Sequence, residues 1–353
     1  MPIGITGTGS YLPTEITKNE DFESHTFLNS DGSNINAPNP VIIKKFKAIT
    51  GIQERRYASK DLNTSDLAYF ASEKAIEDAG IDKETLDYII VAHNFGDVIY
   101  GNIQGDTLPS LATRVKHKLG IKNPRCVAYD ILFGCPGWVQ AMIQAHAFIK
   151  SGIATKCLVI GAETLSRIVD KYDRDSMIYS DGAGATIVEN STNAGEILFH
   201  DSATYANGEA NYLFFGKTYN TKIEDDNLYI KMFGRKIYEF ALTHVPVAMK
   251  HCLDSAKIPI KDLKKIFIHQ ANEKMDEAIV QRFYKLYEID QTPKGVMPMI
   301  IEKLGNSSVA TIPTLLDLVN KNEVENQKLN KGDVILFASV GAGMNVNAIV
   351  YRV

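Results

Sequence analysis

The sequence lacks the features of membrane, secreted and nucleic-acid-binding proteins. No apolar run approaches the ~20 residues that a helix needs to cross a bilayer, and the N-terminus has neither the basic segment nor the apolar core of a secretory signal. The four cysteines form no Cys-x-x-Cys pair and no metal-ligand spacing. The net charge of −4 argues against a polyanion as the main partner. We therefore expect a cytoplasmic protein with reduced thiols and no membrane, metal or nucleic-acid partner.

What is present is an ordinary globular composition with alternating helix and strand patterns. The chain has 353 residues, 45% hydrophobic and 23% charged, which suits about two domain-sized units. Amphipathic periodicity predicts helices over 65–79, 138–150 and 237–253. Short apolar runs predict buried strands over 88–92, 157–161, 266–268 and 334–338. This alternation indicates an α/β protein whose helices cover both faces of buried sheets.

Two stretches are rich in turn-forming residues and are expected to be irregular. Residues 29–40 read Asn-Ser-Asp-Gly-Ser-Asn-Ile-Asn-Ala-Pro-Asn-Pro, a composition that excludes a long regular element. Residues 204–227 are rich in Asn, Gly and Tyr. Long loops in compact domains are often functional, so both stretches are candidates for covering a site.

The chain also matches itself at an offset of 177 residues, which carries Ile89 onto Ile266. The same offset carries the strand 158–160 onto 335–337, and the matched elements follow in the same order. Such self-similarity is typical of an internal duplication. We expect two similar halves that join after the apolar strand 185–188, with boundaries at 1–190 and 191–353.

Cys135 is the strongest candidate nucleophile. An apolar segment runs into Gly134, and a helix is predicted to begin at about Pro136, where proline's missing N–H is not needed. This pattern places the sulfur at a helix N-terminus, which favours the thiolate. The other three cysteines, at 126, 157 and 252, lie in or beside apolar elements and are expected to be buried and inert.

Two polar residues and a glycine loop follow predicted strands or turns in the second half. His269 closes the strand 265–268, and the carboxyl ends of strands are where open α/β sheets place their sites. Asn306 lies in the turn Leu-Gly-Asn-Ser-Ser at 304–308. The segment Gly-Ala-Gly at 341–343 follows the last apolar strand, and its backbone N–H groups can approach an oxyanion. Each of these features, taken alone, is also compatible with a purely structural role.

Together these segments resemble the three active-site motifs of the β-ketoacyl-ACP synthase III family. The motifs are Gly-Cys-Pro-Gly-Trp at 134–138, His-Gln-Ala-Asn at 269–272 and Gly-Asn-Ser-Ser at 305–308. The segments 7–13, 50–56 and 180–185 are also similar to the family, so the resemblance runs almost end to end. It implies the thiolase-like fold of five αβαβα layers, usually in a homodimer.

The resemblance also implies the chemistry and the residues that perform it. Cys135 would hold an acyl group, and loss of CO₂ from malonyl-ACP would supply the carbanion that extends it, as in fatty-acid biosynthesis. His269 and Asn306 would hold the enolate oxygen, and the N–H groups of Cys135 and Ala342 would form a second oxyanion hole. The substrates would be an acyl-CoA or acyl-ACP and malonyl-ACP, and no cofactor is expected.

Three features depart from the family pattern. Many members carry a tryptophan, five residues before the Thr-Gly-Ile motif, that stacks on the adenine of coenzyme A; here that position is Lys45, and the one tryptophan is Trp138. The 29–40 segment is longer than expected. The acyl tunnel in the family is closed by a residue of the partner subunit, often Phe, which here corresponds to Leu108. We therefore expect a longer acyl primer than acetyl, with ACP as a candidate carrier.

A basic face on the helix after His269 is the candidate ACP contact. Lys274 corresponds to a basic ACP-contact residue in the family, and Lys285 falls about 20° from it on a helical wheel, with Arg282 nearby. ACP is acidic, so an overall acidic enzyme needs such a local patch. A solvated helix face with no partner is the alternative.

Other functions remain open at this level. Within the fold, a secondary-metabolism ketosynthase that joins longer acyl chains, as for alkylresorcinol-type or polyketide products, is the main alternative. A thiolase is excluded, because it would need a second cysteine near the C-terminus and none follows Cys252. Papain-like proteases use Cys, His and Asn in the same chain order, but their cysteine lies near a mature N-terminus. A catalytically silent binding subunit is the remaining alternative.

Overall fold

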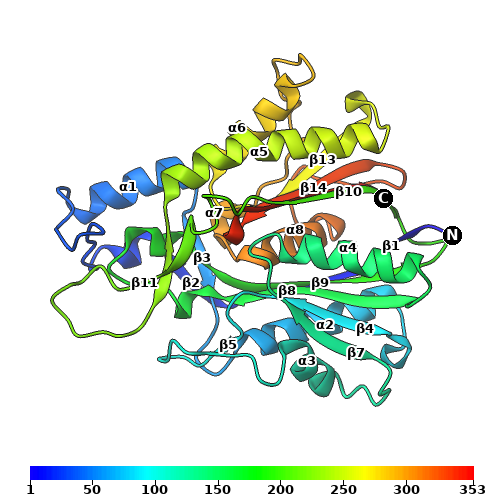
Figure 1. The fold of residues 1–353 in the computed structure, drawn as a ribbon, viewed down its shortest axis with the longest axis horizontal. Helices are drawn as coiled ribbons and strands as arrows, with labels where there is room; N and C mark the ends of the chain where they lie inside the picture. Colours follow the sequence, from blue (N-terminus) through cyan, green and yellow to red (C-terminus); the bar gives the residue numbers. More distant parts are fainter.

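Two twisted β-sheets separated by a layer of helices form the centre of the structure, a computed structural model that describes all 353 residues (Figure 1). The five-stranded sheet has the order β1 (Ile3–Tyr11), β9 (Asp181–Asn190), β8 (Lys156–Thr164), β4 (Tyr88–Ala92) and β7 (Val127–Ile131). The four-stranded sheet has the order β10 (Glu196–Thr204), β15 (Asn345–Arg352), β14 (Val334–Gly341) and β13 (Leu263–Ile268).

The two sheets share one topology, as the internal sequence match predicts. In the first sheet β4 pairs parallel with β8, and β8, β9 and β1 then pair antiparallel in turn. In the second sheet β13 pairs parallel with β14, and β14, β15 and β10 follow in the same antiparallel sense. Ile89 and Ile266 therefore lie on corresponding strands. The first sheet has one further strand, β7, at its edge.

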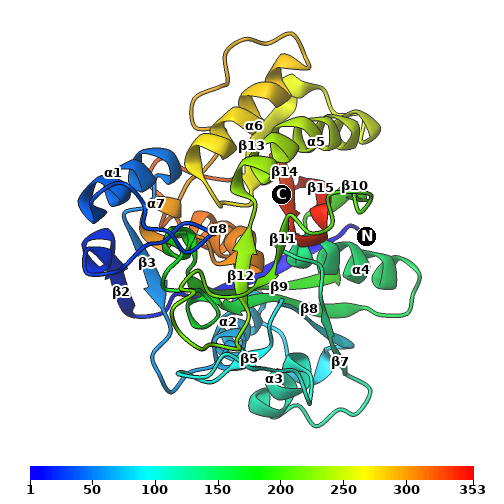
Figure 2. The same ribbon diagram turned by 60° about the vertical axis from the view of Figure 1, so that its left-hand side comes forward.

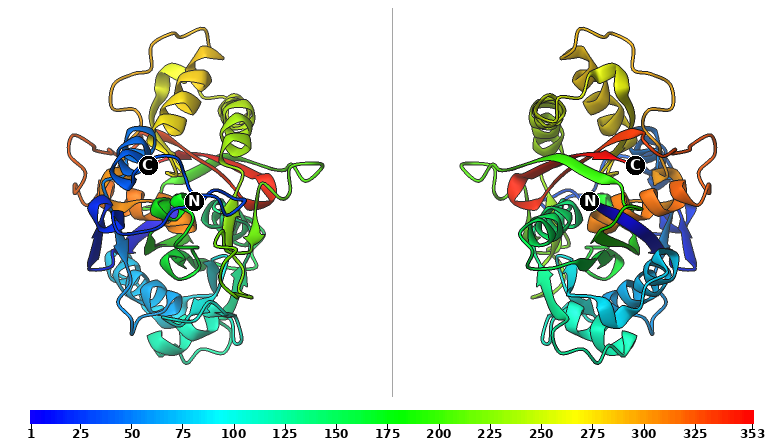
Figure 3. Two further views of the ribbon diagram at one scale, coloured as in Figure 1. Left: turned by 90° about the vertical axis from the view of Figure 1, so that its left-hand side faces the viewer. Right: turned by 90° about the vertical axis from the view of Figure 1, so that its right-hand side faces the viewer.

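Helices complete five layers (Figure 3). Helices α4 (Gly137–Lys150) and α8 (Thr311–Asn320) lie between the sheets, α2 (Thr64–Ala79) and α3 (Leu111–Leu119) cover the outer face of the first, and α5 (Gly234–Ser255) and α6 (Glu273–Lys285) cover the outer face of the second. Along β4 the side chains alternate: Ile89 and Val91 pack against α2 and α3, whereas Ile90 packs in the central layer. Burial on both faces explains why these strands are uniformly apolar.

The predicted helices and strands are confirmed, with small changes at their ends. Helix α2 spans Thr64–Ala79 and ends at Gly80, which adopts a positive φ of 62° as a C-terminal cap. The predicted strand 88–92 is β4, and the predicted helix 138–150 is α4 with one more residue at its start. No helix is both long enough and apolar enough to cross a membrane.

Smaller elements lie around the two sheets. They are β2 (Glu15–Lys18), α1 (Asn39–Thr50), β3 (Glu54–Tyr57), β5 (Asp97–Val98), β6 (Gly105–Asp106), β11 (Leu213–Gly216), β12 (Tyr229–Met232) and α7 (Ile301–Leu304). In Figure 2 α1, β2 and β3 lie on the left, and β11 and β12 lie toward the centre. The expectation that 204–227 is irregular is wrong for residues 213–216, because this segment forms β11 and pairs with β12. Residues 29–38 are irregular as expected, and helix α1 begins at Asn39.

Candidate active site

A largely apolar cavity of about 950 Å³ lies where the loops at the ends of the central strands meet the smaller elements. Cys135, His269, Asn306 and Ala342 all line it, although they come from four separate segments of the chain. Of its 41 lining residues 25 are hydrophobic, which suits an acyl chain better than a polar metabolite. The irregular segment 29–37 contributes several lining residues, so it forms part of the cavity wall.

Cys135 lies in the loop between β7 and α4, directly before the helix N-cap Pro136. Its sulfur faces the N-terminal end of α4 and accepts a hydrogen bond from the Ser308 hydroxyl at 3.4 Å. Cys126, Cys157 and Cys252 are buried in the hydrophobic cores, as expected, and none of them lines the cavity. Among the four cysteines, only Cys135 is therefore placed to meet a substrate.

Burial opposes the effect of the helix N-terminus, which was expected to favour a thiolate at Cys135. Burial raises the pKa of the Cys135 thiol to about 11, although the Ser308 hydroxyl acts in the opposite direction. Desolvation disfavours the charged form, and its effect on the pKa is larger than that of the hydrogen bond from Ser308. Burial therefore favours the neutral thiol of Cys135 near neutral pH.

Two glycines allow the nucleophile loop and the 341–343 loop to touch. A Cβ on Gly134, which has φ of 67°, would lie 2.6 Å from the Ala342 nitrogen, and a Cβ on Gly341 would lie 2.4 Å from the Cys135 nitrogen. Any side chain at either position would force these loops apart. The Cys135 N–H donates to no backbone carbonyl. The two N–H groups named as an oxyanion hole are thus brought together at the nucleophile.

His269 follows β13 directly and lies almost fully buried on the cavity wall. Its backbone N–H donates to Ala338 of β14 at 2.9 Å, and its Nδ1 lies 2.8 Å from the Thr311 hydroxyl. Burial lowers the pKa of the imidazole to about 4. The ring is therefore neutral at physiological pH, and the Thr311 contact leaves Nε2 as the nitrogen available to a substrate.

Asn306 is held by backbone contacts on both sides and by its own side chain. Its N–H donates to Ile178 at 3.0 Å, and its carbonyl accepts from the Ser180 N–H at 2.9 Å. Its Oδ1 accepts the Ser308 N–H at 2.8 Å. Because the oxygen is engaged with the backbone, the amide presents its Nδ2 donors to the cavity.

The remaining predicted residues lie farther from the nucleophile. Lys45 of α1 lines the cavity from an exposed position, and Trp138 is fully buried against Phe337, so it cannot stack on a ligand. Leu108 is 87% exposed and does not line the cavity of its own chain. Lys274 is exposed and pairs with Glu277 at 3.1 Å, while Arg282 donates to the Leu242 carbonyl of α5.

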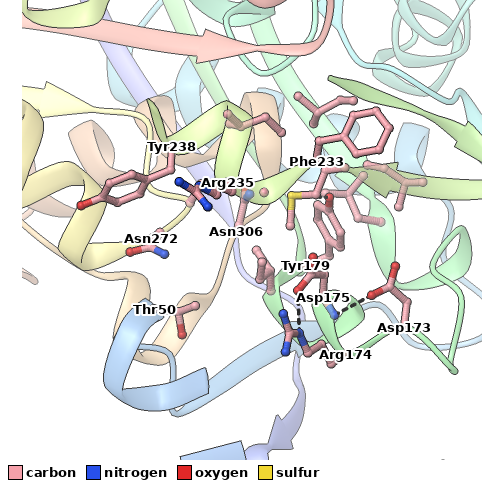
Figure 4. Close-up of a pocket in the computed structure, with 18 of the residues that line it drawn as sticks. Thr50, Asp173, Arg174, Asp175, Tyr179, Phe233, Arg235, Tyr238, Asn272 and Asn306 are labelled. Atoms are coloured by element: carbon pink, nitrogen blue, oxygen red, sulfur yellow. Dashed lines mark hydrogen bonds and ion pairs between the residues drawn. The ribbon is translucent and has the colours of Figure 1, made fainter. Parts of the chain in front are cut away.

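The structure adds charged groups to the cavity that sequence reasoning missed. Asp173, Arg174 and Asp175 form part of one wall, and Figure 4 shows them across the cavity from Thr50 and Asn272. Burial raises the pKa of Asp175 to about 6, and the neighbouring Asp173 adds to this effect. No local pattern marks Asp175 in the sequence, because its burial results from the packing of distant segments.

A cysteine at a helix N-terminus, a neutral histidine and an oriented asparagine in one apolar cavity of a duplicated five-layer fold define a condensing enzyme of the thiolase-like class. The profile described as 3-oxoacyl-[acyl-carrier-protein (ACP)] synthase III matches residues 129–208, and its C-terminal counterpart matches residues 253–353. The chain belongs to this β-ketoacyl-ACP synthase III family, whose members are ketosynthase acyltransferases of fatty-acid biosynthesis.

Known relatives support this membership over the full chain. The β-ketoacyl-[acyl-carrier-protein] synthase III of Staphylococcus saprophyticus is 32% identical over 353 residues, which cover 100% of this chain and 99% of the relative. The crystal structure of 3-oxoacyl-[acyl-carrier-protein] synthase III from Aquifex aeolicus is 31% identical, with a TM-score of 0.80 over 99% of this chain and 100% of that one. Cerulenin-bound OleA of Xanthomonas campestris is 17% identical over 100% of this chain and 97% of that one; its TM-score of 0.78 shows the fold alone.

Proposed function

We propose that this chain transfers an acyl group to Cys135 and extends it by decarboxylative Claisen condensation with malonyl-ACP in the cytoplasm. One observation carries this proposal: Cys135, His269 and Asn306, from separate segments, meet on one apolar cavity in an orientation suited to both half-reactions. Incubation with acyl thioesters followed by intact-mass measurement tests it, because a bound acyl group adds its own mass to the protein.

The first half-reaction is acyl transfer. The sulfur of Cys135 attacks the thioester carbonyl, and the N–H groups of Cys135 and Ala342 hold the oxyanion of the tetrahedral intermediate. The carrier leaves as a free thiol that takes the proton of Cys135, and the acyl group stays as a thioester on the enzyme. The contact of the two loops at Gly134 and Gly341 supports this role.

The second half-reaction is decarboxylation and carbon–carbon bond formation. Malonyl-ACP loses CO₂, and its thioester oxygen takes up the enolate charge. The Nδ2 group of Asn306 and Nε2 of His269 donate to that oxygen. In the structure the Thr311 hydroxyl donates to the Ser308 carbonyl, so His269 donates through Nε2 once that hydroxyl turns its hydrogen to Nδ1. The enolate carbon attacks the acyl-Cys135 carbonyl, and the sulfur leaves as a thiolate to give β-ketoacyl-ACP. The thiolate then takes a proton from water, which restores the thiol. A neutral imidazole suits this donor role, and the lowered pKa of His269 supports it.

The active unit in this proposal is a homodimer. Strand β7 lies at the edge of the five-stranded sheet and pairs only with β4. Several large apolar side chains are exposed on β7 or in the segments that follow β5, β6 and β7: Ile99, Tyr100, Leu108, Val127 and Leu132. A second copy that covers them would bring Leu108 toward the partner's cavity, in keeping with its proposed role as the end of the acyl tunnel.

Charge reversal of Lys274 and Arg282 should weaken the interaction with ACP. Both side chains are exposed on α6, and an acidic carrier needs a basic docking surface on this acidic enzyme. We expect Lys274→Glu combined with Arg282→Glu to raise the apparent KM for malonyl-ACP about tenfold and to leave alkylation of Cys135 by iodoacetamide unchanged. Steady-state kinetics with malonyl-ACP measure the first effect.

Lys331→Glu is the matched control for this surface. Lys331 is exposed just before β14, at the end of that strand opposite the 341–343 loop. Its reversal changes the net charge without touching α6 and should leave the KM for malonyl-ACP unaltered. Unchanged ACP kinetics in the α6 double variant would assign Lys274 and Arg282 to an ordinary solvated helix face.

Medium or longer acyl groups should load Cys135 faster than acetyl-CoA does. Lys45 offers no aromatic face to adenine, and base stacking on an aromatic ring is worth roughly 1–3 kcal/mol, so we expect acetyl-CoA to load about tenfold more slowly than an octanoyl primer. The large apolar cavity favours the longer chain and also supports the second candidate function, the joining of longer acyl chains. Loading rates for acetyl-CoA, octanoyl-CoA and octanoyl-ACP measure this preference.

Lys45→Trp distinguishes the effect of the carrier on the loading rate from the effect of the acyl chain length. The variant restores an aromatic side chain at the exposed face of α1 and should improve loading from both CoA thioesters while leaving octanoyl-ACP unaffected. Fastest loading by acetyl-CoA in the unmodified enzyme would contradict the prediction and make it an ordinary initiator of fatty-acid synthesis.

A further inference from the structure

Ser308 forms a hydrogen bond with Cys135 that has no part in the two half-reactions proposed above. Its hydroxyl lies 3.4 Å from the Cys135 sulfur, to which it donates. A hydrogen bond to sulfur favours the thiolate, and Ser308 lowers the pKa of Cys135 against the larger effect of burial. Ser308 is itself buried, at 4% exposure, on the wall of the cavity.

Asn94 fixes the direction of the Ser308 hydroxyl. It is the second residue after β4. Its Nδ2 group donates to the Ser308 oxygen at 3.2 Å and to Glu163 Oε1 at 2.6 Å. Since the Ser308 oxygen accepts from Asn94, its own hydrogen is free to point at the sulfur. Glu163, Asn94 and Ser308 therefore form a chain of donors and acceptors that ends on Cys135.

Glu163 is a buried carboxyl group that is hydrogen-bonded to Asn94 through only one of its two oxygens. It lies near the end of β8 with no exposed surface, and its Oε2 makes no hydrogen bond. Burial raises its pKa to about 8, although Asn94 acts in the opposite direction. A buried acid with an unpaired oxygen destabilises the fold, so its presence beside the active site calls for a functional reason.

The backbone of Ser308 is held in a conformation that non-glycine residues seldom adopt. Its φ is 52°, in the left-handed region. Its N–H donates to Asn306 Oδ1 at 2.8 Å, and its carbonyl accepts from the Thr311 hydroxyl at 2.9 Å. Such strain persists where the surroundings fix it, and it concentrates at functional sites. Ser308 thus connects Asn306, the Thr311 partner of His269, and the nucleophile.

We propose that Ser308 is a further catalytic residue, which donates a hydrogen bond to the Cys135 sulfur as it becomes a thiolate, and that Asn94 and Glu163 are positioning residues that aim this donor. The same bond stabilises the sulfur when it leaves at the end of condensation. This inference rests on the proposed function in that Cys135 is the nucleophile. No atom is transferred by Ser308; it keeps its proton throughout.

The test is the pH dependence of Cys135 alkylation by iodoacetamide in the full-length protein, with the modified peptide identified by mass spectrometry. Ser308→Ala should raise the midpoint of this dependence by roughly one pH unit, and Asn94→Ala should raise it by less. Ser308→Gly accommodates φ of 52° without strain and should give the same result, so a folding defect in the alanine variant does not decide the outcome. Ser72→Ala, a buried serine that bonds within α2, is the control.

Glu163→Gln tests the role of Glu163 through the pH dependence of Cys135 alkylation, which would not change if Glu163 were only structural. At neutral pH the glutamine should behave like the protonated acid, whereas above about pH 8 it should react faster than the unmodified protein, because no carboxylate forms near the sulfur. The other titratable groups that act on these two residues are Tyr179 and Asp181, with His269 on the same cavity, and all three stay unaltered in the variant.

The rate at which octanoyl-CoA acylates Cys135 at pH 7 should fall about tenfold in both Ser308 variants. A fall of this size is expected when a hydrogen bond to a charged group is lost. An unchanged alkylation midpoint in Ser308→Ala and Ser308→Gly would overturn the inference. The alkylation assay needs no acyl substrate. A midpoint that depends on Ser308 in a protein that no acyl thioester loads would therefore contradict the proposed function, while it would still show that Ser308 stabilises the Cys135 thiolate.

Discussion

Cys135→Ser is expected to abolish condensation, with a loss of at least about 1,000-fold, because a serine hydroxyl is a far poorer nucleophile near neutral pH and the oxyester it forms is a poorer acyl donor. The effect should be large here, because the site offers no second thiol: Cys135 alone among the cysteines lines the cavity. Steady-state formation of β-ketoacyl-ACP measures the loss, and intact mass shows whether an acyl group still binds.

Cys126→Ser is the matched control for this prediction. Cys126 is 1% exposed in the core beneath α3, where a serine replaces a buried thiol without reaching the cavity. This variant should keep its activity and still carry acyl label on the peptide that contains Cys135. Acyl label found on Cys126, Cys157 or Cys252 of the unmodified enzyme would rule out Cys135 as the nucleophile.

The strands and helices could be predicted from the sequence, because a strand that is buried on both faces consists of a continuous run of apolar residues. The run 88–92 is apolar at nearly every position since β4 lies between two helical layers, and the internal offset of 177 residues reflects one topology used twice. The division of the chain at residue 190 stays a proposal, which the separate strand sets of the two sheets support.

The proposed catalytic residues could be selected from the sequence, whereas their surroundings could not. Cys135, His269 and Asn306 each follow a strand or a glycine turn, which is visible in the sequence. Asn94 and Ser308, which are hydrogen-bonded, lie 214 positions apart in the sequence. No sequence pattern around Glu163 indicates that it accepts a hydrogen bond from Asn94. The pKa of Cys135 was misjudged for the same reason: the helix N-terminus is a local feature, whereas the burial that raises the pKa depends on the whole fold.

His269→Ala and Asn306→Ala are each expected to slow decarboxylation of malonyl-ACP by roughly 100- to 1,000-fold while still allowing acylation of Cys135. A preorganised donor to an oxyanion is worth about 3–4 kcal/mol, and each variant removes one of the two donors to the enolate. Asn306→Asp is a sharper variant: its carboxylate can still accept the Ser308 N–H, but it places a negative charge where the amide donors stood.

The two half-reactions are measured separately, by release of CO₂ from malonyl-ACP and by acyl loading of Cys135, so each variant carries its own control. The decarboxylation rate of the unmodified enzyme should show no histidine titration between about pH 5.5 and 8, since burial lowers the pKa of His269 to about 4 and the imidazole stays neutral across that range. The rate should fall only as the pH drops toward 4, where the ring gains a proton. Normal CO₂ release in both alanine variants would show that neither residue holds the enolate, and a titration near pH 6.5 would show that His269 acts in its charged form.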